Sequence, residues 1–74
     1  MKKKEMLSPR QISENFKISY QTVNSYTNLG LLIVRRREGN TRLYDAAEIK
    51  QKLKKIEELK NKGYPLRLIR EMLE

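Results

Sequence analysis

Four arginines lie within eight residues of the sequence, in the stretch RRREGNTRLYD at positions 35–45. A guanidinium group stays charged and presents its donors in a planar fork that matches phosphate oxygens. Arg35, Arg36, Arg37 and Arg42 repel one another, and Glu38 offsets only one of them. A polyanion lying against this stretch would supply the missing countercharge, so phosphate binding is the first chemistry that these residues indicate.

A second group of polar side chains lies between positions 20 and 28 and contains no acidic residue. Amides can bond adenine bidentately, and hydroxyls can bond several bases or phosphates. Taken alone, this group is also compatible with an ordinary solvated helix surface, and the three consecutive arginines with a solvated charge run. The group consists of Tyr20, Gln21, Asn24, Ser25 and Asn28.

Composition limits the classes of function. The 74 residues allow one domain at most, and 17 basic against 9 acidic residues give a net charge of +8. Such a charge favours nucleic acid or an acidic membrane surface as the partner. The chain contains no cysteine and no histidine, so we expect no metal, no cofactor and no enzymatic nucleophile–base pair. The longest apolar stretch, positions 29–34, is too short for a membrane span, and we expect a cytoplasmic protein.

Capping signals predict the elements that position these groups. Ser8 with Gln11 opens a first helix, and Ser19 opens a second that runs from Tyr20 to about Asn28 and stops at Gly30. A hairpin is expected with arms at roughly 33–37 and 41–44. A long helix follows from Asp45 to Gly63, and a last amphipathic helix follows Tyr64-Pro65.

These elements predict a mainly α fold with a small β-hairpin wing and about four helices. We expect residues 1–6 to form a flexible basic tail and residues 7–74 to form a winged helix-turn-helix domain that binds DNA. The second helix would enter a major groove, and the hairpin would present Arg35, Arg37 and Arg42 to the phosphate backbone. We expect Arg42 to supply affinity for any duplex and Asn24 to supply preference at one base pair.

The sequence resembles the winged helix-turn-helix domain of the MerR family of bacterial transcription regulators over roughly Leu7 to Leu73. The motifs that carry the resemblance are Thr22-Val23 and Tyr26 in the second helix, the Gly30-Leu31-Leu32 stop, Thr41-Arg42-Leu43-Tyr44, and Gly63-Tyr64 followed by Leu66 and Ile69.

The resemblance implies that the second helix reads the major groove and that Tyr26, Arg42 and wing arginines such as Arg36 contact the DNA backbone. It also implies a second wing at Lys62 and Tyr64. The complete set of expected DNA contacts is Tyr20, Gln21, Thr22, Asn24, Ser25 and Tyr26 on the recognition helix, Arg35, Arg36, Arg37, Asn40 and Arg42 on the wing, and Lys62 and Tyr64 on the second wing.

The sequence departs from the family pattern at three positions. The family often has an arginine in place of Asn24 and an aromatic residue in place of Ser25, so its base preference does not transfer. A glycine common in the family is replaced by Lys17, which would be strained at a positive φ. The metal-sensing cysteines of some members are absent.

Members of the family continue into a dimerisation helix and an effector domain, whereas this sequence stops at Glu74. After Tyr64 too few residues remain for the heptads of a coiled coil. We expect the chain as given to be a monomer that pairs on DNA, or through a missing C-terminal coiled coil.

Other functions remain open at this point. An architectural, excisionase-like protein that bends DNA for recombination would use the same groups, and the segment LSPRQISENFKIS is similar to such proteins and to short MerR relatives. An RNA-binding module is disfavoured because one Phe and four Tyr leave few aromatics for base stacking.

Overall fold

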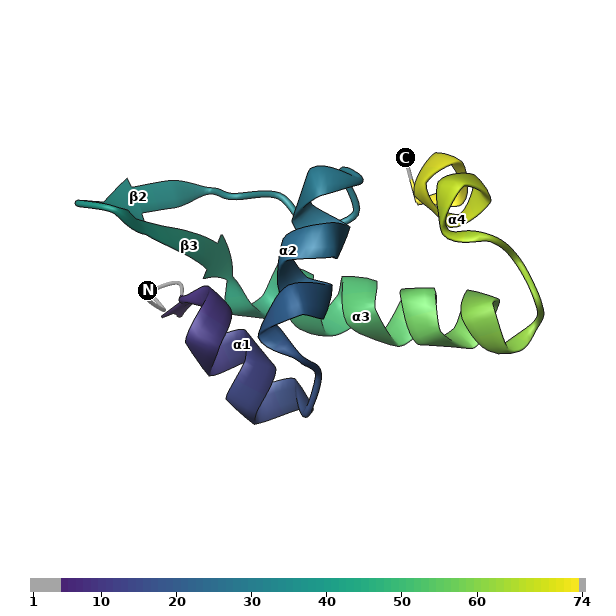
Figure 1. Ribbon diagram of the computed structural model, residues 1–74, viewed down its shortest axis with the longest axis horizontal. Helices are drawn as coiled ribbons and strands as arrows, with labels where there is room; N and C mark the ends of the chain where they lie inside the picture. Colours follow the sequence, from purple (N-terminus) through teal and green to yellow (C-terminus); the bar gives the residue numbers. More distant parts are fainter. Residues whose placement is uncertain (1–4, 74) are drawn as a thin grey trace.

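The computed structural model describes residues 5–73 and shows four helices and a small three-stranded sheet in this part of the chain (Figure 1). Helix α1 spans Pro9–Phe16 and α2 spans Tyr20–Asn28. The predicted capping box is confirmed, because Ser8 Oγ accepts from the Gln11 amide at 3.2 Å and Gln11 Oε1 accepts from the Ser8 amide at 2.9 Å. Ser19 caps α2 by accepting from the Thr22 amide at 3.0 Å. Local signals therefore define both helices of the expected helix-turn-helix.

The turn between these helices contains a strained residue. Lys17 has φ 56° and ψ 42°, the left-handed conformation that favours glycine. Ser13 holds the turn on both sides, because its carbonyl accepts from the Ile18 amide at 3.3 Å and its hydroxyl donates to the Ile18 carbonyl at 2.6 Å. The expectation of strain at Lys17 is confirmed in its φ angle.

The chain turns away from α2 two residues after the helix ends, at Gly30, which has φ 82° as expected for the predicted glycine stop. The Leu31 amide then donates to the Tyr26 carbonyl at 2.8 Å, a bond typical of a glycine C-cap. Leu31 and Leu32 are both buried directly after this turn. The stop therefore sends two leucines into the core before the chain reaches the hairpin.

The sheet has the strand order β1-β3-β2, with β1 at Met6–Leu7, β2 at Arg36–Glu38 and β3 at Thr41–Asp45. The first arm of the hairpin begins later than the expected position 33, because the chain first leaves the buried pair Leu31-Leu32. Strand β1 was not expected. Met6 pairs with Asp45 and so belongs to the sheet rather than to the expected tail at residues 1–6, of which residues 1–4 lie outside the described part.

Helix α3 spans Ala46–Asn61 and α4 spans Leu66–Met72. Asp45 caps α3 as predicted, with Oδ1 accepting from the Ala47 and Glu48 amides at 3.0 and 3.2 Å. The chain leaves α3 through Gly63, which has φ 94°. Figure 1 shows the β2–β3 hairpin and the α3–α4 turn at opposite ends of the long axis, with α2 between them.

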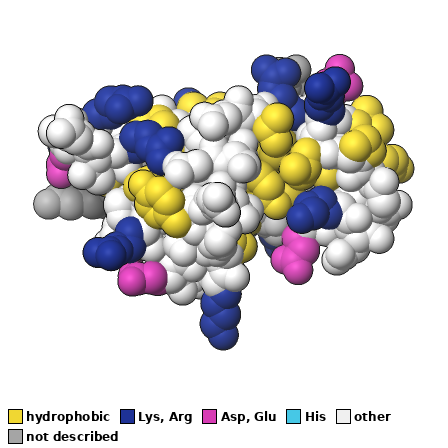
Figure 2. All heavy atoms as spheres, in the orientation of Figure 1, with side chains coloured by type: hydrophobic (Ala, Val, Ile, Leu, Met, Phe, Trp, Pro, Cys, Tyr) yellow, Lys and Arg dark blue, Asp and Glu magenta, His cyan; other side chains and the backbone are white. Residues whose placement is uncertain are grey.

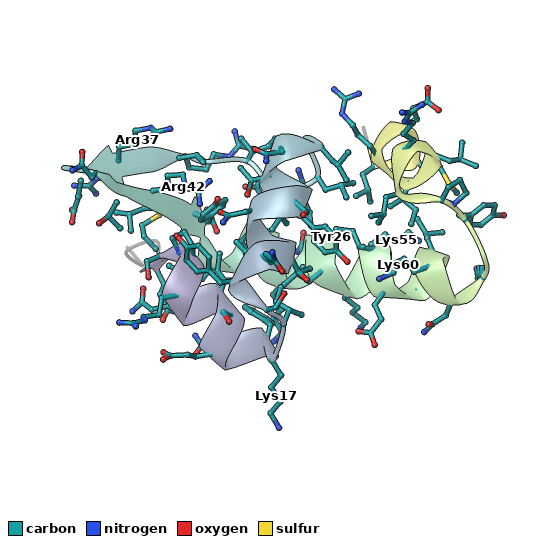
Figure 3. All side chains as sticks on the ribbon, viewed as in Figure 1. Lys17, Tyr26, Arg37, Arg42, Lys55 and Lys60 are labelled. Atoms are coloured by element: carbon teal, nitrogen blue, oxygen red, sulfur yellow. The ribbon has the colours of Figure 1, made fainter. Side chains whose placement is uncertain are left out.

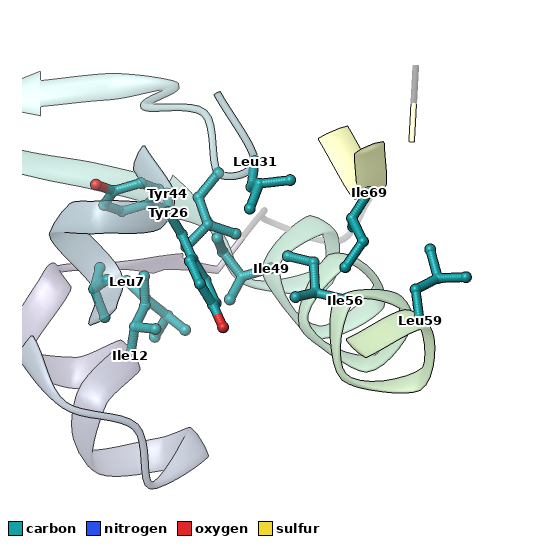
Figure 4. Close-up of a cluster of buried hydrophobic side chains, with 11 residues drawn as sticks. Leu7, Ile12, Tyr26, Leu31, Tyr44, Ile49, Ile56, Leu59 and Ile69 are labelled. Carbon is teal, nitrogen blue, oxygen red and sulfur yellow. The ribbon is translucent and has the colours of Figure 1, made fainter. Parts of the chain in front are cut away.

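One hydrophobic cluster joins these elements. Ile49, Ile56 and Leu59 of α3 are buried, as is Ile69 of α4. Figure 4 shows the Tyr26 ring among the labelled core side chains, between those of the α1 side and those of α3. The buried hydrophobic residues are Leu7, Ile12, Val23, Tyr26, Leu31, Leu32, Tyr44, Ile49, Ile56, Leu59 and Ile69.

Candidate nucleic-acid interface

The exposed side of α2 carries uncharged polar groups, as the sequence predicts. Gln21 and Ser25 are exposed, Asn24 is half-buried, and Tyr20 has 53% of its surface exposed. Thr22 is half-buried, and its hydroxyl lies 2.8 Å from the hydroxyl of Ser19 at the helix cap. The helix sequence YQTVNSYTN contains no acidic residue that would repel a polyanion.

Tyr26 does not share this side of the helix. Only 8% of its surface is exposed, because its ring packs in the core. Its hydroxyl lies 3.4 Å from Lys60 Nζ on α3, which can donate to it. Figure 3 shows Tyr26 and Lys60 together between α2 and α3. Tyr26 is thus placed with a cation rather than with the amides of α2.

A groove of about 620 Å³ is lined by this pair and by further residues of α1, α3 and the α1–α2 turn. Four lysines line it, Lys17, Lys50, Lys54 and Lys60, against one carboxylate, that of Glu57. Sequence reasoning did not select these lysines. They are scattered in the sequence, and the only signal of their presence was the net charge of +8.

The hairpin divides its charged residues between two sides. In the ladder Arg37 pairs with Arg42, Arg36 with Leu43 and Glu38 with Thr41. Because successive side chains alternate across a strand, Arg37 and Arg42 share one side, which we call the inner side. Arg36 and Glu38 share the other, outer side, where their side chains form an ion pair at 3.5 Å. Like charges directly opposite each other destabilise a sheet, so an anion beside Arg37 and Arg42 would relieve a real cost.

Arg35, which was expected on the phosphate-facing surface, is hydrogen-bonded to a carboxylate of α3. Its Nε donates to Glu48 Oε1 at 3.0 Å and its Nη2 to Glu48 Oε2 at 2.5 Å. This bidentate hydrogen bonding raises the pKa of Arg35 and holds the pKa of the Glu48 carboxyl below its ordinary value, against the opposing effect of partial burial. Arg35 therefore fastens the start of the hairpin to the first turn of α3.

The inner side of the hairpin is joined to α2 by two hydrogen bonds. Arg42 Nη2 donates to Asn24 Oδ1. The hydroxyls of Tyr44 and Thr27 lie 2.7 Å apart, and Thr27 Oγ1 also lies 2.8 Å from the Val23 carbonyl. A threonine hydroxyl has one proton, so Thr27 donates to Val23 and accepts from Tyr44. Asn24 and Arg42, for which the sequence suggests separate roles, are therefore in contact.

The remaining expected residues lie at the two ends of the molecule. Asn40 is exposed at the tip of the hairpin, after Gly39 with φ 59°. Lys62 ends α3 and is exposed, and Tyr64 has 40% of its surface exposed in the α3–α4 turn. The structure thus brings Asn24, Arg37 and Arg42 to one region and leaves Lys62 and Tyr64 at a distance from it.

On the face drawn in Figure 2 the basic side chains lie in separate groups, toward the hairpin and toward α4, with hydrophobic and uncharged surface between them. Helix α2, with the sequence YQTVNSYTN, carries no lysine or arginine itself. Figure 3 places Arg37 and Arg42 at the hairpin and Lys17 at the α1–α2 turn. Within residues 5–73 no group of acidic, histidine or cysteine side chains could hold a metal ion. None of the helices in this range is long and apolar enough to cross a membrane.

Comparisons with known proteins agree with this architecture. In the solved structures, the chain is similar to a MerR-family transcriptional regulator from Bacillus cereus, with a TM-score of 0.79 and 20% sequence identity. The likeness covers 93% of this chain and 52% of that one, so the chain spans about half the length of that regulator. No curated protein matches the sequence significantly. A family model described as the MerR HTH family regulatory protein matches residues 7–74. The chain therefore belongs to the MerR family of helix-turn-helix regulatory proteins.

Proposed function

We propose that the chain is a sequence-specific duplex-DNA-binding domain of a transcription regulator. The observation that carries this proposal is the joining of two groups by the Arg42–Asn24 hydrogen bond: the polar side of α2 and the inner side of the hairpin. The first group suits base edges in a major groove and the second suits phosphates. A duplex lying against both would supply the countercharge that Arg37 and Arg42 lack among residues 5–73.

The molecule is long enough to contact the DNA backbone at both of its ends while α2 lies in the groove between them. Its principal extents are 36 × 29 × 21 Å, and the long axis is about one turn of B-DNA. With α2 in a major groove, the hairpin and the α3–α4 turn would each reach the flanking backbone. In that arrangement Arg37 and Arg42 bind phosphates at one end, and Lys62 and Tyr64 at the other.

In this arrangement Tyr26 contacts the DNA backbone and not a base. Its buried ring fixes the hydroxyl in position beside Lys60 Nζ, 3.4 Å away. A phosphate at the mouth of the neighbouring groove would accept from both groups. Tyr26 and Lys60 thus form a backbone contact, which retains the role that the family resemblance implies for Tyr26.

The assembly that we propose is a monomer in solution that pairs on DNA. Helix α4 uses its apolar side within the domain: Ile69 is buried, and Leu66 and Leu73 pack partly against the core. The exposed hydrophobic residues of α4 are Leu68 and Met72, with 38% and 45% of their surfaces exposed. The net charge of +8 also opposes self-association at low salt. Sedimentation at micromolar concentration without DNA should therefore give one monomeric species.

Selection of bound sites from a random duplex pool, followed by affinity measurements at several salt concentrations, tests the proposal. One recurring sequence should emerge, and about 4 to 6 neutralised phosphates should give a log–log salt slope of about −4 to −5. A slope near zero at measurable affinity would remove DNA as the partner. Enrichment of tandem sites that bend on binding would instead favour the architectural function.

A further inference from the structure

The Arg42–Asn24 contact determines which atoms of the asparagine amide remain available. A guanidinium group has no acceptor, so the amide atom that faces Arg42 must be the oxygen. The amide nitrogen of Asn24 therefore points away from this bond. The Tyr44–Thr27 hydroxyl pair lies two residues further along β3 and three further along α2, and it holds the same strand against the same helix. Strand β3 is thus held against α2 at two points, one of which is the Asn24 side chain itself.

An asparagine that reads adenine uses both ends of its amide: the oxygen accepts from the N6 amino group, and the nitrogen donates to N7. In this protein the oxygen is engaged by a cation. The group left for a base is a donor only, Nδ2 of Asn24, while the remaining N–H groups of Arg42 stay available for a phosphate. Guanine presents two acceptors in the major groove, N7 and O6, whereas adenine presents one acceptor and one donor.

We propose that Asn24 and Arg42 act as one unit that selects a guanine in the major groove, with Arg42 as the residue that sets the orientation of Asn24. This inference rests on the proposed function, since it requires that α2 lie in a major groove. It differs from the separate roles that the sequence suggests, in which an asparagine selects adenine and an arginine only adds affinity.

The experiment measures affinity for the selected duplex and for duplexes changed one base pair at a time. Wild-type protein should prefer guanine at one position by about 10-fold or more. In Arg42→Ala the amide oxygen is released, so preference at that same base pair should move toward adenine. Asn24→Ala should lower the guanine preference there, and the double variant should lose less than the product of the two single losses.

Two further variants separate the hydrogen bond from charge and from folding. Arg37→Ala removes a cation from the same side of the hairpin without touching Asn24, so it should weaken all duplexes alike. Asn24→Asp keeps an acceptor for Arg42, and hence the α2–hairpin link, but removes the amide donors. It should lose the guanine preference while thermal unfolding followed by circular dichroism shows a folded domain.

Three results would overturn the inference: adenine preference in the wild type at this position, effects of Asn24→Ala and Arg42→Ala at different base pairs, or an Arg42→Ala profile as uniform as that of Arg37→Ala. In each of these cases duplex binding persists and the proposed function survives. Failure of the wild-type protein to bind any duplex would remove both.

Discussion

The two sides of the hairpin carry similar charged side chains in different surroundings. On the outer side Arg36 lies 3.5 Å from the Glu38 carboxylate, and beside the hairpin Arg35 is bound bidentately by Glu48. On the inner side Arg37 and Arg42 face each other across the ladder, and among residues 5–73 neither forms an ion pair with a carboxylate. The inner side is also hydrogen-bonded to α2, through Arg42 and Tyr44. A run of arginines in the sequence is therefore not one site, because strand alternation and carboxylate partners divide it.

The difference between the two sides of the hairpin is tested most strongly by replacing the arginines in pairs. Hydrogen bonds to charged groups contribute about 1.5–3 kcal/mol each. The double variant Arg37→Ala with Arg42→Ala should therefore bind the duplex at least about 100-fold more weakly. It should also flatten the log–log salt slope by about two units, because two phosphate contacts are lost. Arg35→Ala with Arg36→Ala is the matched control, with the same loss of charge, and should cost much less. Fluorescence anisotropy at several salt concentrations measures both. Equal losses from the two pairs would contradict the division.

The attachment of the inner side to α2 can be tested through stability. Tyr44→Phe removes the bond to Thr27 in the core and should lower the free energy of unfolding by about 1 kcal/mol in urea denaturation. Tyr64→Phe makes the same chemical change at an exposed position and should stay within about 0.5 kcal/mol of wild type. If both variants unfold like wild type, the hydroxyl pair does not hold the hairpin.

The ion pair of Arg35 should appear in the acid dependence of stability. The folded-state pKa of Glu48 is lowered, so its stabilisation is present above the ordinary glutamate pKa of about 4.3 and is lost as pH falls through the folded-state value. Glu48→Gln should therefore be less stable than wild type at pH 7, and this difference should shrink toward pH 3. Glu58→Gln, whose carboxylate lies 3.8 Å from Lys55, is the control for a surface carboxylate. A difference that stays constant with pH would show that the ion pair contributes nothing.

The smallest expected effect concerns the outer side. Glu38→Gln removes the carboxylate beside Arg36 and adds one net positive charge near the duplex. If the outer side faces away from DNA, affinity should rise by less than about threefold at low salt, through long-range attraction alone. A tenfold rise in the same binding assay would mean that Arg36, once released, reaches the duplex, and that both sides of the hairpin lie against it.

Sequence reasoning succeeded where the determining interactions are local. Ser8 and Gln11 lie three residues apart, as do Asp45 and Glu48, and each pair locates a helix start. It failed where partners are distant in the chain. The Arg35–Glu48 bond joins residues 13 apart, the Arg42–Asn24 bond 18 apart and the Lys60–Tyr26 contact 34 apart. Which arginines face α2 depends on such contacts and on the strand register, and neither has a local signature.

The most direct test of the central claim is nuclear magnetic resonance of the arginine side chains. The Nε–H signals of Arg35, Arg36, Arg37 and Arg42 can be followed while the selected duplex is added to the labelled domain. If the duplex binds the inner side, the signals of Arg37 and Arg42 should shift strongly. The signal of Arg35 should hardly shift, because its Nε already donates to Glu48 at 3.0 Å. Large shifts at Arg35 and Arg36 with unchanged signals at Arg37 and Arg42 would place the duplex on the opposite side of the hairpin and contradict the proposed interface.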